Sequence, residues 1–247
     1  MKAVYRTRNV TLYHGDCLDV VPKLRRDVDA VVTSPPYNTL GRRVPRNGTG
    51  ILKSSGWLAK LNRIGYDDDL PENTYQAWLN YVLALCLDRC RGLVWLNHKV
   101  RYRAGVAVHP ARFVRLPIYS EVIWSRAGSV ALNCRRFAPS HEGLWAFGRP
   151  HWWNDSANSQ LSVWSISQCV DRSDHPCPLP LELATRPILA SCPPGGVVFD
   201  PFAGSCTVGV AALSHGRRFV GIEKNAAYLD AAVSRLKSWR SKLAKAA

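Results

Sequence analysis

Short apolar runs recur along the chain, each bounded by polar residues, Gly or Pro. Runs of this length with such boundaries favour buried β-strands. The predicted strands lie at residues 10–13, 29–33, 92–96, 120–124, 143–147, 197–199 and 218–223.

Between these runs, apolar positions recur every three or four residues, as one face of a helix requires. The predicted helices span residues 17–24, 71–86, 180–191 and 207–213, and a last one carries Leu229, Ala232, Val233, Leu236 and Trp239 on one face. Strands that alternate with helices predict an α/β fold with a doubly wound, mostly parallel sheet.

The length of 247 residues and a hydrophobic content of 47% suit one domain, which we expect to span residues 1–247. Two stretches differ in character. Residues 39–65 hold five glycines and six basic residues without an acid, and residues 100–140 are rich in arginine. We expect both to be insertions that contact a target, and residues 149–180 to be largely loop.

The charge is strongly unbalanced, with 33 Lys and Arg against 18 Asp and Glu and a formal net charge of +15. Such an excess indicates a polyanionic partner, although a solvated basic surface is the alternative. No run of about 18 apolar residues occurs, so no membrane span is expected. The start of the chain does not resemble a secretion signal, and a cytoplasmic protein is expected.

Eight cysteines are present, but no Cys-x-x-Cys. We expect small buried hydrophobic residues rather than disulfides. A zinc site built from Cys169, His175 and Cys177 is the alternative, and no metal is predicted.

A candidate cofactor unit runs from Val197 to Glu223. A strand ends in Asp200, a turn of small residues leads into a helix, and the second strand ends in Glu223. Gly204 and Ser205 allow a ligand to approach the backbone, and a terminal acid can accept hydrogen bonds from ribose hydroxyls. The turn is not G-x-G-x-x-G, which disfavours a pyrophosphate and an NAD-linked oxidoreductase. The alternative is an ordinary turn with a chance acid.

A candidate catalytic turn, Ser34-Pro35-Pro36-Tyr37, follows the strand at 29–33. Two prolines remove two N–H donors, so their carbonyl oxygens and the Ser34 hydroxyl can accept hydrogen bonds from an amino group. Tyr37 can stack on a base. The alternative is a common Pro-Pro turn at the end of a strand.

TSPPYN and FDPFAGS together resemble the S-adenosylmethionine (AdoMet)-dependent amino-methyltransferases of DNA, which act on adenine N6 or cytosine N4. The resemblance covers about residues 12–236, including segments 66–68 and 139–142, and implies a Rossmann-like AdoMet-dependent methyltransferase fold. It implies catalytic roles for Ser34, Pro35, Pro36 and Tyr37. The AdoMet-binding residues that it implies are Asp16, Cys17, His175, Pro176, Asp200, Phe202, Ala203, Gly204, Ser205, Thr207 and Glu223.

The catalytic tetrad precedes the AdoMet loop, which matches the permuted beta arrangement of the family's DNA enzymes. RNA or protein amino-methyltransferases usually show the reverse order. In this family, Ser before Pro-Pro-Tyr favours cytosine N4, with adenine N6 as the alternative. An inactive nucleic-acid-binding protein of the same fold is a further alternative, which the intact tetrad disfavours.

The expected substrate is double-stranded DNA, with the target base flipped out of the stack. A homodimer and a cognate restriction endonuclease of a restriction-modification pair are further expectations. The candidate DNA contacts, for bases or phosphates, are Arg42, Arg43, Arg46, Lys53, Arg135 and Arg136.

Overall fold

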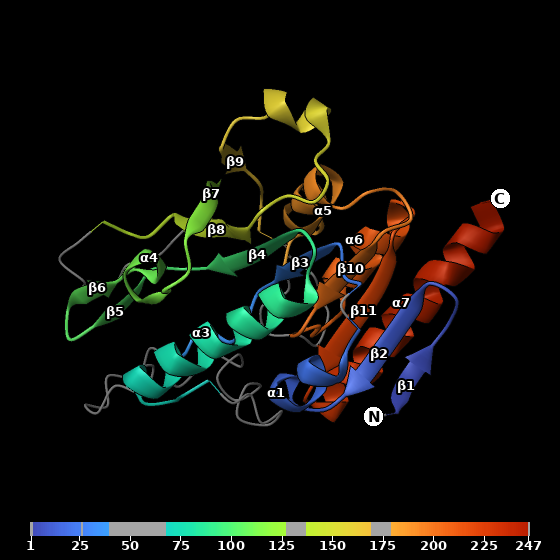
Figure 1. Cartoon of the computed structure of the whole chain (residues 1–247), viewed down its shortest axis with the longest axis horizontal. Coiled ribbons are helices and arrows are strands. Elements are labelled where there is room, and N and C mark those ends of the chain that lie inside the picture. The colour runs from blue at the N-terminus through green and yellow to red at the C-terminus, as the bar shows by residue number, and fades with distance from the viewer. Residues whose placement is uncertain (1, 26, 40–67, 127–136, 169–178, 247) are drawn as a thin grey trace.

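The computed structural model describes residues 2–25, 27–39, 68–126, 137–168 and 179–246 (Figure 1). Nine strands form one sheet in the order β1-β2-β11-β10-β3-β4-β8-β7-β9. These strands are β1 (Ala3–Arg6), β2 (Val10–His14), β3 (Ala30–Thr33), β4 (Leu93–His98), β7 (Ile118–Ser125), β8 (His141–Gly148), β9 (Val163–Ser165), β10 (Val197–Asp200) and β11 (Arg218–Glu223).

Five neighbouring strands of the sheet, β2, β11, β10, β3 and β4, are parallel. Strand β8 pairs antiparallel with β4 and with β7, and β1 pairs antiparallel with β2. A parallel block with helical crossovers, in which β1 and β8 run antiparallel to their neighbours and the edge strand β9 pairs parallel with β7, is the mostly parallel α/β sheet that the sequence predicts. That prediction is confirmed.

Helices cover both faces of the sheet. Within the described residues the helices are α1 (Cys17–Val20), α3 (Glu72–Arg89), α4 (Pro110–Phe113), α5 (Leu181–Ser191), α6 (Thr207–Ser214) and α7 (Ala226–Ala246), with 3₁₀ turns η1 (Val21–Lys23) and η3 (Asp155–Ser159). Figure 1 shows α3 across one side of the strands and α5, α6 and α7 on the other.

Two hydrophobic clusters, one on each face, follow from the alternation of side chains along each strand. In β3, Ala30 and Val32 belong to the cluster with α5, α6 and α7, whereas Val31 belongs to the cluster with α1 and α3. In β10, Val198 faces the first cluster and Phe199 the second. The strands are buried on both sides, so their sequences read as continuous apolar runs.

Several elements were not predicted, namely β1, α4, β9, η3 and the hairpin of β5 (Arg101–Arg103) and β6 (Val106–Val108). Each of these helices and strands has at most five residues, which is too short for a periodic signal in the sequence. Helix α3 also continues beyond the predicted end to Arg89. Residues 149–168 are mostly irregular, as predicted, apart from η3 and β9.

The described cysteines are all free thiols, and Cys17, Cys86, Cys192 and Cys206 are buried. This confirms the prediction of small hydrophobic residues for these four. No helix in the described part of the chain is long and apolar enough to cross a membrane.

Candidate active site

The predicted site segments meet at one edge of the sheet. In a parallel block the carboxyl ends of the strands share an edge, where ligands of α/β proteins bind. The tetrad follows β3, the small-residue turn follows β10, and Asp16 follows β2. Because β8 runs antiparallel to β4, its first residues lie at this edge too, with Gly143 opposite His98.

The hydroxyls of Ser34 and Tyr37 lie 2.9 Å apart and share one acceptor. The Oδ1 atom of Asn97, at the end of β4, accepts from Tyr37 at 2.7 Å and from Ser34 at 3.3 Å. Asn97 is itself oriented, because its Nδ2 donates to the Gly143 carbonyl at 3.1 Å. The sequence assigns Asn97 no role, since a single polar residue closing a buried strand carries no motif.

The two proline carbonyls of the tetrad differ, which corrects the expectation that both are free. The Pro36 carbonyl accepts from the Tyr75 hydroxyl at 2.7 Å. No hydrogen bond to the Pro35 carbonyl occurs within the described residues. Pro35 therefore offers the backbone acceptor, whereas Pro36 fixes the turn to α3.

Packing around Tyr37 limits its movement. The His98 ring lies 4.6 Å from the Tyr37 ring, and the Lys99 ammonium lies 5.2 Å from the Tyr37 centroid. Burial lowers the pKa of His98 to about 3, so the imidazole is neutral at pH 7. Its Nε2 contacts the Tyr75 hydroxyl at 2.8 Å.

The chain leaves the tetrad through Asn38, a non-glycine residue with a φ of 57°. The Asp68 carboxylate accepts from the backbone N–H groups of Asn38 and Thr39. The Asn38 side chain also exchanges hydrogen bonds with the backbone of Leu70. These contacts stabilise a conformation that few residues adopt unaided.

Asp200 connects the two halves of the site. Its Oδ1 accepts from the Thr33 hydroxyl at 2.7 Å and from the Phe202 N–H at 3.0 Å. Thr33 immediately precedes Ser34, so the bond joins the small-residue turn to the catalytic turn. Burial raises the pKa of Asp200 to about 7, and the charge of Glu223 acts in the same direction.

Glu223 organises the turn after β10. Its Oε2 accepts from the Gly204 N–H at 2.8 Å, and its Oε1 accepts from the Asn225 N–H at 2.7 Å. Burial raises the pKa of Glu223. Gly204 has a φ of 49° and Cys206 a φ of 63°, so the turn is left-handed at two positions. At Cys206 the side chain faces the steric cost that glycine avoids.

The entrance to helix α6 is covered by Arg235 of α7. The Arg235 Nη1 lies 3.3 Å from the Ser205 carbonyl and 3.1 Å from the Thr207 hydroxyl. Phe202 contacts Trp78, with ring centroids 5.4 Å apart, and Ala203 donates to the Ile222 carbonyl at 2.8 Å. All predicted positions of this turn thus lie together.

Asp16 caps α1 at the same edge, accepting from the Leu18 N–H at 2.9 Å. Lys224 lies 3.2 Å from its other oxygen. Burial would raise the pKa of Asp16, but the Leu18 bond and Lys224 outweigh it and lower the pKa. Burial raises the pKa of Cys17 to about 12, so the thiol is neutral.

The site fits an adenosyl sulfonium ligand. The Glu223 carboxylate accepts hydrogen bonds from two backbone N–H groups, and its remaining lone pairs can accept from ribose hydroxyls. Three carboxyl groups, Asp16, Asp200 and Glu223, favour a cation over a pyrophosphate. The chemistry of this donor set therefore fits AdoMet.

Other predicted residues lie outside the described part of the chain. They are His175, Pro176, Arg42, Arg43, Arg46, Lys53, Arg135 and Arg136, together with the alternative zinc ligands Cys169, His175 and Cys177. The insertion 39–65 is described only at Thr39.

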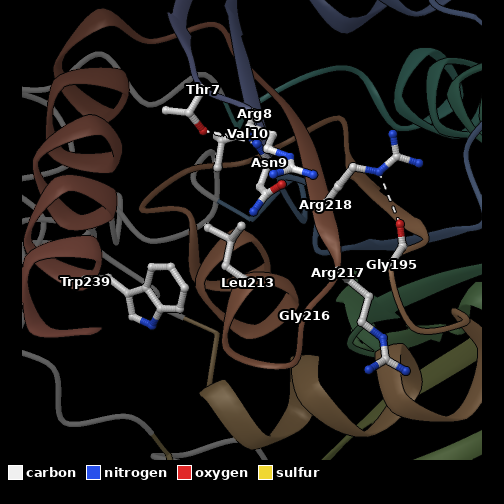
Figure 2. A pocket seen from close by; sticks show the side chains of 10 residues that line it. All are labelled: Thr7, Arg8, Asn9, Val10, Gly195, Leu213, Gly216, Arg217, Arg218 and Trp239. Carbon is white, nitrogen blue, oxygen red and sulfur yellow. Dashed lines mark hydrogen bonds between the residues drawn. The ribbon is translucent and has the colours of Figure 1, made fainter. Parts of the chain in front are cut away.

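Two cavities lie at opposite ends of the parallel strands. One of about 420 Å³ borders the catalytic turn and is lined by Asn38, Lys99 and Arg126, among others. Another of about 710 Å³ is lined by Arg8, Arg218 and Trp239, among others (Figure 2). It lies at the amino ends of β10 and β11, away from the predicted site residues.

Comparison with known proteins decides the family. The family model for DNA methylases, N6_N4_Mtase, matches residues 28–234. The chain belongs to this DNA methylase family. This DNA methylase is therefore an AdoMet-dependent DNA amino-methyltransferase.

Individual relatives agree with the assignment. The type II methyltransferase M2.DpnII of Streptococcus pneumoniae is 29% identical, over 96% of this chain and 93% of its own. The solved PvuII DNA methyltransferase, described as cytosine-N4-specific, is 18% identical with a TM-score of 0.73, over 94% of this chain and 88% of its own. A putative DNA modification methylase from Thermus thermophilus, solved with S-adenosyl-L-methionine, is 19% identical with a TM-score of 0.65, over 92% of this chain and 93% of its own.

Proposed function

We propose that this DNA methylase transfers a methyl group from AdoMet to N4 of a cytosine flipped out of double-stranded DNA. The observation that carries the proposal is the bond between Thr33 and Asp200 at 2.7 Å. It joins a turn built to receive an amino group to a turn suited to AdoMet. AdoMet supplies the electrophilic methyl group.

The tetrad prepares the amino group for attack. The lone pair of an exocyclic amine is delocalised into the base, so the nitrogen is a weak nucleophile. The Ser34 proton is directed to Asn97 or Tyr37, which leaves the Ser34 oxygen as an acceptor. With the Pro35 carbonyl, it can accept both amino N–H groups and localise the lone pair. Positioning then supplies most of the remaining rate enhancement.

The AdoMet contacts that we propose follow the same edge. Glu223 receives the ribose hydroxyls, Gly204 and Ser205 allow close approach, and Asp16 and Cys17 flank the ligand from β2. Phe202, Ala203 and Thr207 complete the turn, and His175 and Pro176 are assigned by resemblance alone.

The choice of cytosine N4 over adenine N6 is supported by Ser34, since serine before Pro-Pro-Tyr is the commoner residue in cytosine N4 enzymes. The likeness to a structure described as cytosine-N4-specific agrees with it. Adenine N6 is the second candidate, with the same chemistry.

We predict that the chain forms a single domain and that its insertions 39–65 and 100–140 contact the DNA. We also predict a homodimer, a cognate restriction endonuclease and a cytoplasmic location. The net charge of +15 supports a polyanionic substrate.

The experiment is to incubate the protein with AdoMet and unmethylated plasmid DNA, digest the DNA to nucleosides and measure them by mass spectrometry. We expect N4-methylcytosine. N6-methyladenine would overturn the choice of base, and neither product across several DNA sources would overturn the function.

A further inference from the structure

Besides the hydrogen bonds to Asn97, the catalytic turn makes one to a buried carboxylate, Glu142, the second residue of β8. Only 6% of Glu142 is exposed, and its Oε2 accepts from the Tyr37 hydroxyl at 3.2 Å. Its Oε1 pairs with Arg126 Nη1 at 3.0 Å. Arg126 is held in turn by the Pro139 carbonyl at 3.3 Å and lies over the Trp124 ring. The carboxylate is therefore fixed, with its charge balanced.

The protons of this network can be counted. Ser34 and Tyr37 each carry one hydroxyl proton. Asn97 Oδ1 accepts from both hydroxyls, and Glu142 Oε2 accepts from Tyr37. A neutral amide oxygen such as that of Asn97 orients a hydroxyl but does not take up its proton. Among these four side chains, Glu142 is the group that can.

We propose that Glu142 acts through Tyr37 as the acceptor end of a path for the proton that the target amino group loses. This rests on the proposed function. As the nitrogen bonds the methyl carbon, the carbon–sulfur bond breaks and its electron pair stays on sulfur. The nitrogen then gives one proton to Ser34 Oγ, the Ser34 proton passes to Tyr37, and the Tyr37 proton passes to Glu142. Glu142 releases it to solvent before the next turnover.

Glu142 does not touch the substrate in this scheme, so it is a positioning residue. We expect Glu142→Gln, which keeps the shape of the side chain, to lower the single-turnover methylation rate by about 100-fold. AdoMet affinity measured by calorimetry, and DNA affinity, should change less than about twofold. Glu142→Asp should recover part of the rate. Glu121→Gln is the matched control, because Glu121 on neighbouring β7 accepts from Trp145 and lies outside the network.

A double-mutant cycle separates this role from a structural one. If Glu142 acts through Tyr37, Tyr37→Phe combined with Glu142→Gln should be no slower than Tyr37→Phe alone. Additive losses, or a wild-type rate for Glu142→Gln, would overturn the proposal.

Should Glu142→Gln unfold because Arg126 loses its partner, the charge-neutral pair of Glu142→Gln and Arg126→Gln replaces it. We expect this pair to bind AdoMet normally and to methylate about 100-fold more slowly than the wild-type protein. A wild-type rate for the pair would overturn the proposal. An active wild-type protein separates either result from a failure of the proposed function.

Discussion

Replacing Glu72 with Gln tests how the cavity beside the catalytic turn is held in place. Glu72, in the first turn of α3, accepts from Arg101 at 2.7 Å through each oxygen and from Arg103 Nε at 2.8 Å. Arg101 is 2% exposed in its side chain, and both arginines line the smaller cavity. Arg103 also donates to the Asn38 carbonyl, directly after the tetrad.

The free energy that Glu72 contributes to stability follows from its lowered pKa. Burial alone would raise this pKa, but the hydrogen bonds from Arg101, Gln76 and Arg103 lower it from 4.5 to about 2. At about 1.4 kcal/mol per pH unit, the folded state gains about 3 kcal/mol from the ionised carboxylate. Screening of the quarter-exposed side chain reduces this to about 2 kcal/mol. Because the folded pKa is lowered, the gain is complete above pH 4.5 and is lost as the pH falls towards 2.

Urea unfolding of both proteins at pH 7 and at pH 3.5 measures the effect. We expect Glu72→Gln to lower the free energy of unfolding by about 2 kcal/mol at pH 7, and the difference to shrink by about 1 kcal/mol at pH 3.5. Glu182→Gln is the control, since its pair with Arg186 lies one helical turn away at the surface and should contribute under about 0.5 kcal/mol. A difference that stays constant with pH would refute the reasoning.

Four further variants test the site and its packing. Ser34→Ala and Tyr37→Phe should each slow methylation at least about 100-fold and leave calorimetric AdoMet affinity unchanged; weakened AdoMet binding would contradict their assignment to the amino group. Wild-type affinity for the cationic AdoMet should rise as the pH increases through about 7, where Asp200 ionises, and Asp200→Asn should bind more weakly without this dependence. An unchanged affinity would remove Asp200 from the AdoMet site. Gly209→Ala should lower the free energy of unfolding by about 2 kcal/mol in urea, because the added Cβ would lie 2.5 Å from Cys206 Sγ. Wild-type stability would contradict that packing.

The main strands and helices were predictable because their signal is periodic or continuous. The runs at Val31 and Val198 are apolar on both faces, which only strands buried on both sides require. The small hairpin β5–β6 was not predictable, since its six residues include two arginines whose role appears only opposite Glu72. A charge that pairs across the fold looks like a surface charge in the sequence.

The tetrad and the turn after β10 could be read from motifs, because their chemistry is local in the chain. The residues that hydrogen-bond to the tetrad come from other strands of the sheet. Asn97 closes a different strand, and Glu142 begins a strand of opposite direction. Only the order of β4 and β8 in the sheet brings these two residues to Tyr37. Sheet order, unlike strand position, leaves no local trace in the sequence.

The most direct test of the proposed methyl transfer follows the methyl group itself. Methyl-deuterated AdoMet is incubated with the protein and equal amounts of unmethylated plasmid DNA and of RNA, and every nucleoside is then measured by mass spectrometry. We expect a trideuterated methyl group on N4 of cytosine in the DNA and none in the RNA. Label confined to the RNA, or absent from every nucleoside, would contradict it.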